Sequence, residues 1–175
     1  MKREIVLLAA AHDVGAFTCG SDWLDKYFRH HALRNQSKGY GRTYVAIRTE
    51  GPARVDGYYT VSMSSVQFSH LPDALHFGAM PKYPMPAAHL GCLAVAADCQ
   101  RQGLGSILLI DALRRMIAAS EMVAARAVDV KAIDDAAREW YADYGFLPFR
   151  DLKGPPYHLY LPLDTARAIV AAAGD

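Results

Sequence analysis

Cysteine is scarce in this chain of 175 residues, and long apolar runs are missing. The three cysteines, Cys19, Cys92 and Cys99, are odd in number and form no Cys-x-x-Cys pair, which argues against a disulfide-stabilised fold and for a reducing compartment. No apolar run approaches the roughly 20 residues of a membrane-spanning helix. The apolar run after the basic start is too short for a signal peptide. We therefore expect a cytoplasmic protein that makes no membrane contact.

An excess of one charge is also missing. The chain has 19 Lys and Arg against 18 Asp and Glu, a net charge of +1, so any nucleic-acid contact must be a local patch. The histidines show neither His-x-x-x-His nor His-Glu-x-x-His spacing, and we expect no metal. The absence of Gly-x-Ser-x-Gly argues against a serine hydrolase.

The length predicts one domain spanning residues 1–175, since domains average about 150 residues. Proline-dense residues 69–86 are expected to form a loop between two halves of the chain. Hydrophobic periodicity predicts the order β-α-β-β-β-α-β-α-β-β, followed by a short helix. The expected strands are 2–10, 43–48, 55–68, 87–95, 124–130, 146–149 and 157–161; the expected helices are 21–33, one with a stripe over 108–117, 134–144 and 164–173. The strands 43–48 and 55–68, joined by a Gly51-Pro52 turn, are expected to form an antiparallel hairpin. The order indicates a mixed sheet with helices on both faces.

A glycine-rich turn, Gln100-x-x-Gly103-x-Gly105, lies between a buried strand and the longest helix. Glycines allow close approach of a ligand, and the helix start offers unpaired N–H groups with a partial positive charge, which together suit a pyrophosphate. Arg101 can add a charge and Ser106 a hydroxyl. A glycine turn without a ligand remains the alternative.

With its flanking residues, this turn closely resembles the acetyl-CoA-binding segment of the GNAT N-acetyltransferases. A second stretch resembles the later motif of that superfamily. The residues that carry the two likenesses are Leu93-Ala94-Val95, Gln100, Gly103, Gly105 and Leu108-Leu109, then Asp134, Ala137, Trp140-Tyr141 and Gly145-Phe146. Ala96 and Asp134 depart from the usual acidic residue and Asn of the superfamily.

The resemblance implies an α+β protein with the GNAT (acyl-CoA N-acyltransferase) fold. This fold is a mixed, mostly antiparallel sheet of six to seven strands, with splayed central strands and helices on both faces. Pantetheine of the co-substrate acetyl-CoA would lie between the splayed strands as an added strand. The resemblance implies that acetyl-CoA is held by Leu93, Val95, Arg101, Gln102, Gly103, Leu104, Gly105 and Ser106.

Acetyl transfer to an amine needs a proton donor for the leaving thiolate, and a tyrosine suits this role. The superfamily places its tyrosine four residues before the glycine of Gly-Phe, which here is Tyr141. Tyr144 lies on nearly the same helical face and is the second candidate. Aromatic packing of both is the alternative.

No general base is evident, because Glu139 and Asp143 are expected on other helical faces. At pH 7, deprotonating a lysine-type amine costs roughly 4–5 kcal/mol, whereas an α-amine costs only about 1 kcal/mol. The lack of a base therefore favours an α-amine as the acceptor.

A basic stretch with interleaved aromatics precedes the glycine turn. Residues 26–49 contain no Asp or Glu, but they include Lys26, Arg29, Arg34, Lys38, Arg42 and Arg48. Such a run suits a phosphate backbone with unstacked bases. A solvated helix face is the alternative.

A narrower resemblance is to the GNAT toxins of type II toxin–antitoxin systems, over about residues 12–162. It rests on Phe17-x-Cys19-Gly20, Trp23-Leu24, Ala32 to Gln36, Gly41 to Val45 and Gly57-Tyr58-Tyr59. It implies acetylation of the α-amine of aminoacyl-tRNA, which blocks translation, and a ribbon–helix–helix antitoxin as partner. Arg34, Lys38 and Arg42, with Lys82 as an addition, would then hold the acceptor stem. A homodimer is a further option.

Two rival functions remain open. An ordinary small-molecule or peptide N-acetyltransferase shares the co-substrate site and Tyr141 but needs no basic patch. An inactive GNAT module would bind a partner without catalysis. We expect Trp23 and Trp140 to be packing anchors and Cys92 to be a core residue.

Overall fold

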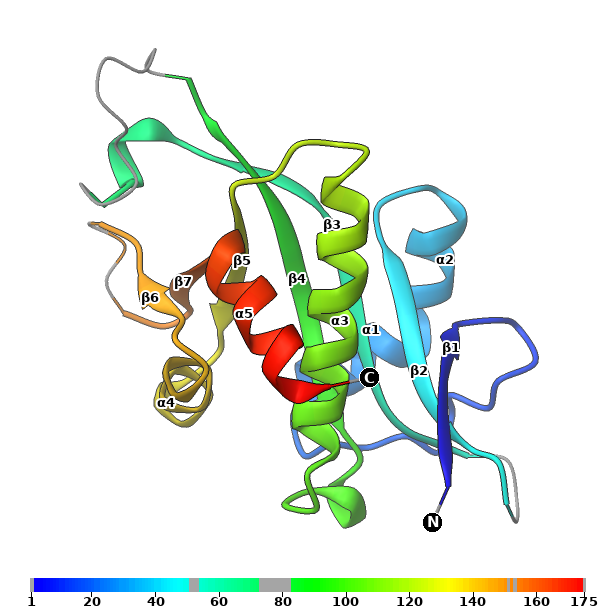
Figure 1. Ribbon diagram of the computed structural model, residues 1–175. Helices are drawn as coiled ribbons and strands as arrows, with labels where there is room; N and C mark the ends of the chain where they lie inside the picture. The colour runs from blue at the N-terminus through cyan, green and yellow to red at the C-terminus, as the bar shows by residue number, and fades with distance from the viewer. Residues whose placement is uncertain (1, 51–53, 73–82, 151, 153, 175) are drawn as a thin grey trace. The chain divides into compact units, whose positions relative to one another are not determined.

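The computed structural model describes residues 2–50, 54–72, 83–150, 152 and 154–174 (Figure 1). Within them the strands run in the order β1-β2-β3-β4-β5-β7-β6 in one seven-stranded sheet. The strands are β1 (Arg3–Leu7), β2 (Arg42–Arg48), β3 (Val55–Val66), β4 (Met85–Val95), β5 (Ala127–Ala132), β6 (Leu147–Pro148) and β7 (Tyr157–Pro162). The helices are α1 (Asp22–His30), α2 (Ala32–Ser37), α3 (Leu104–Ser120), α4 (Asp135–Asp143) and α5 (Leu163–Ala173), with short 3-10 turns η1 (Phe68–His70) and η3 (Ala97–Cys99).

The chain divides into two compact units. Unit 1 comprises Met1–Ser62 with Gly91–Ala112, and unit 2 comprises Met63–Leu90 with Leu113–Asp175. β3, β4 and α3 contribute residues to both units. The expectation of one domain over residues 1–175 stays a prediction.

The predicted element order is confirmed, but several boundaries differ from the expected ones: β1 ends at Leu7 rather than at residue 10, and β5 spans Ala127–Ala132 rather than 124–130. The helix expected over 21–33 is two helices, because His31 leaves the helical conformation at φ −121°. β4 begins at Met85, inside the segment expected to be a loop; residues 73–82 of that segment lie outside the described ones. β6 is shorter than the expected strand 146–149, because the N–H of Phe146 bonds to the carbonyl of Tyr141 and belongs to the end of α4.

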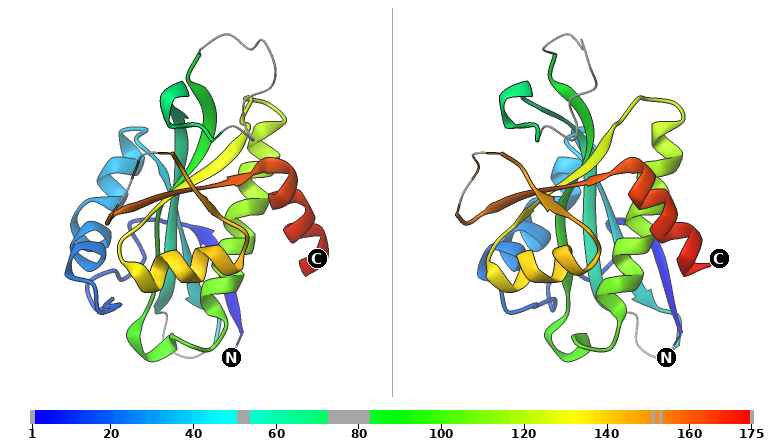
Figure 2. Two further views of the ribbon diagram at one scale, coloured as in Figure 1. Left: turned by 90° about the vertical axis from the view of Figure 1, so that its left-hand side faces the viewer. Right: turned by 60° about the vertical axis from the view of Figure 1, so that its left-hand side comes forward.

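Unit 1 is built on an antiparallel β1-β2-β3 ladder, which includes the predicted hairpin. Neighbouring residues of β3 point to opposite faces of the sheet. On one face, Phe28 of α1 stacks on Tyr58 with ring centroids 4.2 Å apart. On the other face, a Cβ at Gly57 would lie 2.8 Å from Leu108 Cδ1 of α3. Within unit 1, α1 and α3 therefore cover opposite faces of β3, as expected (Figure 2).

A β-bulge in unit 1 places a carboxylate among arginines. Gly57 pairs with Ala46 and Val55 with Ile47, so Asp56 is the extra residue. Its fully buried side chain accepts hydrogen bonds from Arg3 Nε at 2.7 Å and Arg48 Nε at 2.8 Å. Burial acts to raise the pKa of Asp56, but the hydrogen bonds from Arg48 and Arg3 outweigh it and lower that pKa.

In unit 2, the parallel pairing of β4 with β5 is short. Ala87 to Leu90 pair with Ala127 to Val130, and the register ends there although both strands continue. β7 pairs antiparallel with both β5 and β6. One core cluster of unit 2 comprises Val66, Leu71, Met85, Ala87, Ala127, Phe149 and Tyr160. This pairing provides the splayed strands that the GNAT resemblance implies.

We predict that Gly57→Ala destabilises the protein by about 1–3 kcal/mol, because the new methyl overpacks the contact with α3. Urea unfolding measures the change. Gly15→Ala is the matched control, since its Cβ would meet the Asp13 side chain at 3.4 Å rather than a packed helix. Equal stability of the two variants would contradict the close packing of Gly57.

We predict that the stabilisation from Asp56 is lost in acid. Its pKa is lower in the folded than in the unfolded state, where it is about 3.9, so its contribution is complete above about pH 4 and decreases as the pH falls below that value. Asp56→Asn should lower the urea midpoint at pH 7, and the gap from wild type should narrow at pH 3. A gap independent of pH would contradict the ionic role of Asp56.

Candidate functional site

The glycine-rich turn is held in shape by side-chain bonds to the backbone. Gln100 Nε2 donates to the carbonyl of Val95 at 3.1 Å and to that of Cys19 at 2.8 Å, which ties the turn to the end of β4. Gln102 Nε2 donates to the carbonyl of Asp98 at 2.9 Å. Arg101 and Gly103 have left-handed φ values of 58° and 81°. The turn therefore has a defined backbone path into α3.

The start of α3 suits an anion. Leu104 is buried and anchors the first turn, Gly105 and Ser106 are half-buried, and Arg101 and Gly103 are exposed. No heavy atom lies within 4 Å of the position where Gly103 would carry a Cβ, so the approach is open on that side. N–H groups of a first helical turn and the helix dipole favour negative charge. The donor set fits a pyrophosphate group.

Leu93 and Val95 lie on β4 beyond the residues that pair with β5. Both are half-buried and share a strand face with His89 and Gly91, while the residues between them are buried. Cys92 is one of those buried residues, and burial raises its pKa to about 12. The expectation that Cys92 is a core residue is confirmed.

Tyr141 is fixed in unit 2 by packing around α4. Asp134 caps this helix by accepting a hydrogen bond from the N–H of Ala137 at 2.8 Å. The Tyr141 side chain is buried, with ring centroids 5.0 Å from Trp140 and 5.1 Å from Phe146. The aspartate that replaces the family's asparagine is therefore engaged in helix capping.

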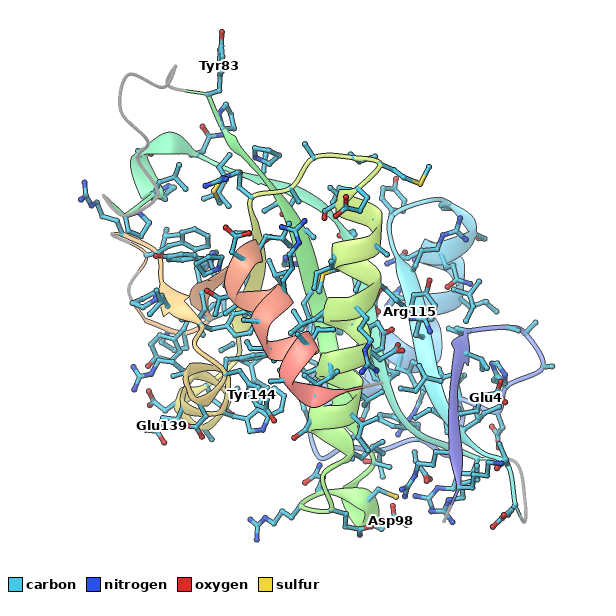
Figure 3. All side chains as sticks on the ribbon, in the orientation of Figure 1. Glu4, Tyr83, Asp98, Arg115, Glu139 and Tyr144 are labelled. Carbon is cyan, nitrogen blue, oxygen red and sulfur yellow. The ribbon has the colours of Figure 1, made fainter. Side chains whose placement is uncertain are left out.

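Tyr144 occupies a different environment from Tyr141. It is the half-buried C-cap of α4, and its ring lies 5.0 Å from that of Trp140. Glu139 and Asp143 are exposed, and Figure 3 shows Glu139 and Tyr144 extending from different sides of α4. The structure thus distinguishes the two candidate tyrosines by burial.

Two cations of the basic stretch have partners within unit 1, which the sequence pattern did not show. Arg29 Nε donates to the carbonyl of Phe17 at 2.9 Å, and Arg48 pairs with Asp56. These two cations hold unit 1 together. Arg29 is exposed although it makes this bond, and the other exposed members of the stretch are Lys26, Arg34, Lys38 and Arg42.

Three of these exposed cations are the predicted substrate residues, and all lie in unit 1. Arg34 is on α2, Lys38 caps its C-terminus and Arg42 begins β2. The segment is held by Gln36, whose Nε2 donates to the carbonyl of Leu8 at 2.8 Å and whose Oε1 accepts from the N–H of Thr43 at 3.0 Å. Lys82 lies outside the described residues.

The two tryptophans have different surroundings. Trp23 is 60% exposed and stacks on Tyr27 at 5.9 Å, so the expectation that it anchors packing is wrong. Trp140 is half-buried, and its ring lies against the rings of Tyr141 and Tyr144. The expectation that Trp140 anchors packing is therefore confirmed.

The sequence interpretation missed a polar group on the sheet of unit 2. His89 Nδ1 lies 2.8 Å from Asp129 Oδ2, and Ser64 Oγ donates to Asp129 Oδ1. The alternation in β4, which puts His89 on the same strand face as Leu93, was the available signal. The alternation in β4 does not show that Ser64 of β3 and Asp129 of β5 lie beside His89.

Among the described residues, no group of three or more His, Cys, Asp or Glu side chains is arranged to hold a metal ion. Within the same residues, no helix has the length and apolar character needed to cross a membrane.

Known proteins resemble this chain over nearly its whole length. Residues 23–146 match the model of the acetyltransferase (GNAT) family. A tRNA-acetylating toxin of Mycobacterium tuberculosis is 36% identical over 163 residues, which cover 93% of each chain.

Three solved structures are similar in fold. AtaT complexed with acetyl-methionyl-tRNAfMet has a TM-score of 0.85 and 26% identity, covering 96% of this chain and 99% of that one. AtaTR bound with AcCoA has a TM-score of 0.82 and 28% identity, covering 95% and 97%. A mutant AtaT toxin bound to the C-terminus of the antitoxin AtaR has a TM-score of 0.78 and 25% identity, covering 95% and 97%.

Proposed function

The chain belongs to the acetyltransferase (GNAT) family, and we propose that it acetylates the α-amine of aminoacyl-tRNA as the toxin of a toxin–antitoxin pair. It is an acetyl-CoA-dependent N-acetyltransferase. The observation that carries the choice of acceptor is the 36% identity to a tRNA-acetylating toxin over 93% of both chains. The similar AtaT complex with acetyl-methionyl-tRNAfMet supports the same acceptor.

Acetyl-CoA would be held by the turn before α3 and by the unpaired part of β4. Arg101, Gln102, Gly103, Leu104, Gly105 and Ser106 would bind the pyrophosphate through the turn and the helix start. Backbone groups of Leu93 and Val95 would bond to the pantetheine amides, as an added strand does. When bound, acetyl-CoA supplies a thioester that carries the acetyl group.

Tyr141 would act as the general acid. Its buried position on the capped helix α4 holds the hydroxyl in a defined place, which proton transfer requires. Tyr144, at the helix end, is the weaker candidate.

The exposed cations of unit 1 would bind the acceptor stem of tRNA. Arg34, Lys38 and Arg42 lie within nine residues of each other, and the exposed rings of Tyr40 and Trp23 belong to the same unit. Cations that contact phosphates and aromatic rings that stack on bases together suit an unpaired nucleic-acid end. An ordinary small-molecule acetyltransferase would need no such surface.

Residues 1–175 would form one GNAT domain, and the antitoxin would be a small ribbon–helix–helix protein. Binding of the antitoxin AtaR by the similar AtaT toxin supports an antitoxin as partner. A homodimer is a further part of this proposal.

We predict that Tyr141→Phe lowers kcat for acetylation of charged tRNA by about 10²–10⁴-fold, because the thiolate loses its proton donor. Transfer of labelled acetyl to bulk aminoacyl-tRNA measures this, with the free amino acids as control acceptors. Tyr144→Phe is the matched control and should retain most activity. Calorimetry should show unchanged acetyl-CoA binding in both variants; loss of activity in Tyr144→Phe alone would reverse the assignment.

We predict that Arg34→Ala and Arg42→Ala each raise KM for charged tRNA about tenfold. Each should also reduce by about one the number of phosphate contacts that is derived from the slope of log binding constant against log salt concentration. Arg167→Ala is the control, because it removes an exposed charge from unit 2 that already pairs with Asp164 and Glu121. Turnover unchanged by the first two substitutions would favour the small-molecule enzyme.

A further inference from the structure

Unit 1 contains a cavity of about 280 Å³, which is lined by the segment that follows β1 and by α1 and α2. Leu8, Val14, Phe28 and Leu33 supply its apolar walls. Leu8 and Phe28 are almost fully buried, whereas Leu33 is 41% exposed. The volume lies just below the range of sites for complete drug-sized ligands, so the cavity suits a single ring system.

The charged side chains that line this cavity are cationic. Arg29 and Arg34 contribute guanidinium groups, and no Asp or Glu is among the described residues of its walls. Arg29 donates to the carbonyl of Phe17, and its Nη2 lies 3.8 Å from Asp25 Oδ2. Arg34 Nη2 donates only to a neutral partner, Nδ1 of His31 at 3.2 Å, in the contacts that the structure describes. A fitting ligand therefore combines an apolar ring with a negative group.

His12 adds a hydrogen-bond donor to the wall of the cavity. Its Nδ1 accepts from the N–H of Ala9 at 3.0 Å. Because the backbone N–H can only donate, the ring proton of His12 is on Nε2, and this nitrogen is a donor. Every nucleobase has an acceptor atom at its edge that such a donor can reach.

A row of rings on α1 leads to the same arginine. Trp23 stacks on Tyr27 with centroids 5.9 Å apart and planes 15° apart, and the Tyr27 ring lies 6.5 Å from that of His31. His31 accepts from Arg34, which lines the cavity. The Trp23 side chain is 60% exposed. Exposed rings that end at a cation are a surface on which unpaired bases stack while their phosphates contact the cation.

An acidic segment of a protein partner is the alternative occupant. The centre of a protein–protein interface is depleted of charged residues, whereas two arginines line this cavity and exposed Lys26 belongs to the helix with the row of rings. Arg34 is also the first of the exposed cations proposed to bind the acceptor stem, the others being Lys38 and Arg42. The cavity is therefore continuous with a surface already suited to RNA.

We propose that this cavity binds one unpaired nucleotide at the acceptor end of the charged tRNA. This inference rests on the proposed function. The base enters the cavity, where the apolar walls take the place of its neighbours in a stack and His12 donates to its edge. Arg34 and Arg29 bind the adjoining phosphate. A base that is paired within a duplex cannot enter, so the site favours an RNA whose end is single-stranded.

Binding of an RNA stem-loop that copies the acceptor stem tests the proposal. The probe is used with its single-stranded 3′ end and as a blunt-ended version without it. We expect wild type to bind the first about tenfold more tightly, which is within the effect of one stacked base. Making the unpaired nucleotides abasic one at a time keeps the phosphates, and one position should account for most of the loss. Equal affinity for the two stem-loops would overturn the proposal.

Leu33→Asp places a carboxylate beside the phosphate, and Leu33→Asn is the matched control of the same shape without the charge. We expect the Asp variant to bind the RNA with the single-stranded end about tenfold more weakly than the Asn variant and to lose its preference over the blunt one. The loss from combining Leu33→Asp with the critical abasic RNA should be smaller than the product of the separate losses, because both remove the same contact.

Two further variants keep the test independent of one substitution. Ala10→Asp with its control Ala10→Asn repeats the charge comparison from the segment after β1, where Ala10 is exposed and lines the cavity. It replaces the Leu33 pair if the urea midpoint shows that Leu33→Asp is unfolded. His12→Asn keeps an acceptor for the N–H of Ala9 but removes the Nε2 donor, and it should weaken binding of the single-stranded end while blunt-ended RNA binds as before.

The outcomes distinguish failure of this inference from failure of the proposed function. Asp variants that match their Asn controls, in a protein that acetylates charged tRNA, overturn the nucleotide site alone. Unchanged RNA binding by Leu33→Asp with lost binding of the antitoxin assigns the cavity to a protein partner and also overturns it. Wild type that shows the preference for the single-stranded end but acetylates no charged tRNA supports the site and overturns the proposed reaction. Wild type that binds no RNA overturns both.

Discussion

The short parallel pairing of β4 with β5 is the constraint on which the functional interpretation depends. The two strands are paired from Ala87 to Leu90 and from Ala127 to Val130, and no further, although β4 continues to Val95. Backbone groups beyond the paired stretch need other partners, because buried N–H and C=O groups are costly when left unpaired. A ligand with amides of its own can supply them.

Packing in unit 1 holds the glycine-rich turn and the start of α3 in place. Gly57 has no side chain, so α3 approaches β3 closely, and η3 with the glycine-rich turn joins the end of β4 to the first turn of α3. Gln100 ties the turn to Val95 and Cys19. An anion-binding helix start works only when its position is fixed, and here a close packing contact and two side-chain bonds fix it.

The cationic side chains of unit 1 fall into two groups, those with partners inside the unit and those that are exposed. Arg48 and Arg3 stabilise the buried Asp56 at a β-bulge, and Arg29 donates to a backbone carbonyl. Arg34, Lys38 and Arg42 remain exposed on α2 and at the start of β2. The first group costs little to keep charged because each partner is hydrogen-bonded. The second group is available to phosphates, whose contacts depend strongly on salt.

The sequence by itself determined the element order, the β2-β3 hairpin, the glycine-rich turn before α3 and the family, because these depend on periodicity and on residues close together in the chain. It could not determine the break of the helix at His31, the bulge at Asp56 or which arginines form internal hydrogen bonds and ion pairs. Those depend on partners many residues away: Arg48 differs from Arg42 only because β3 brings Asp56 beside it. The Ser64–Asp129–His89 row is the clearest case, since three strands separated by up to 65 residues supply one hydrogen-bonded group. A linear pattern shows which face each residue occupies, but only the pairing of strands decides which residues meet there.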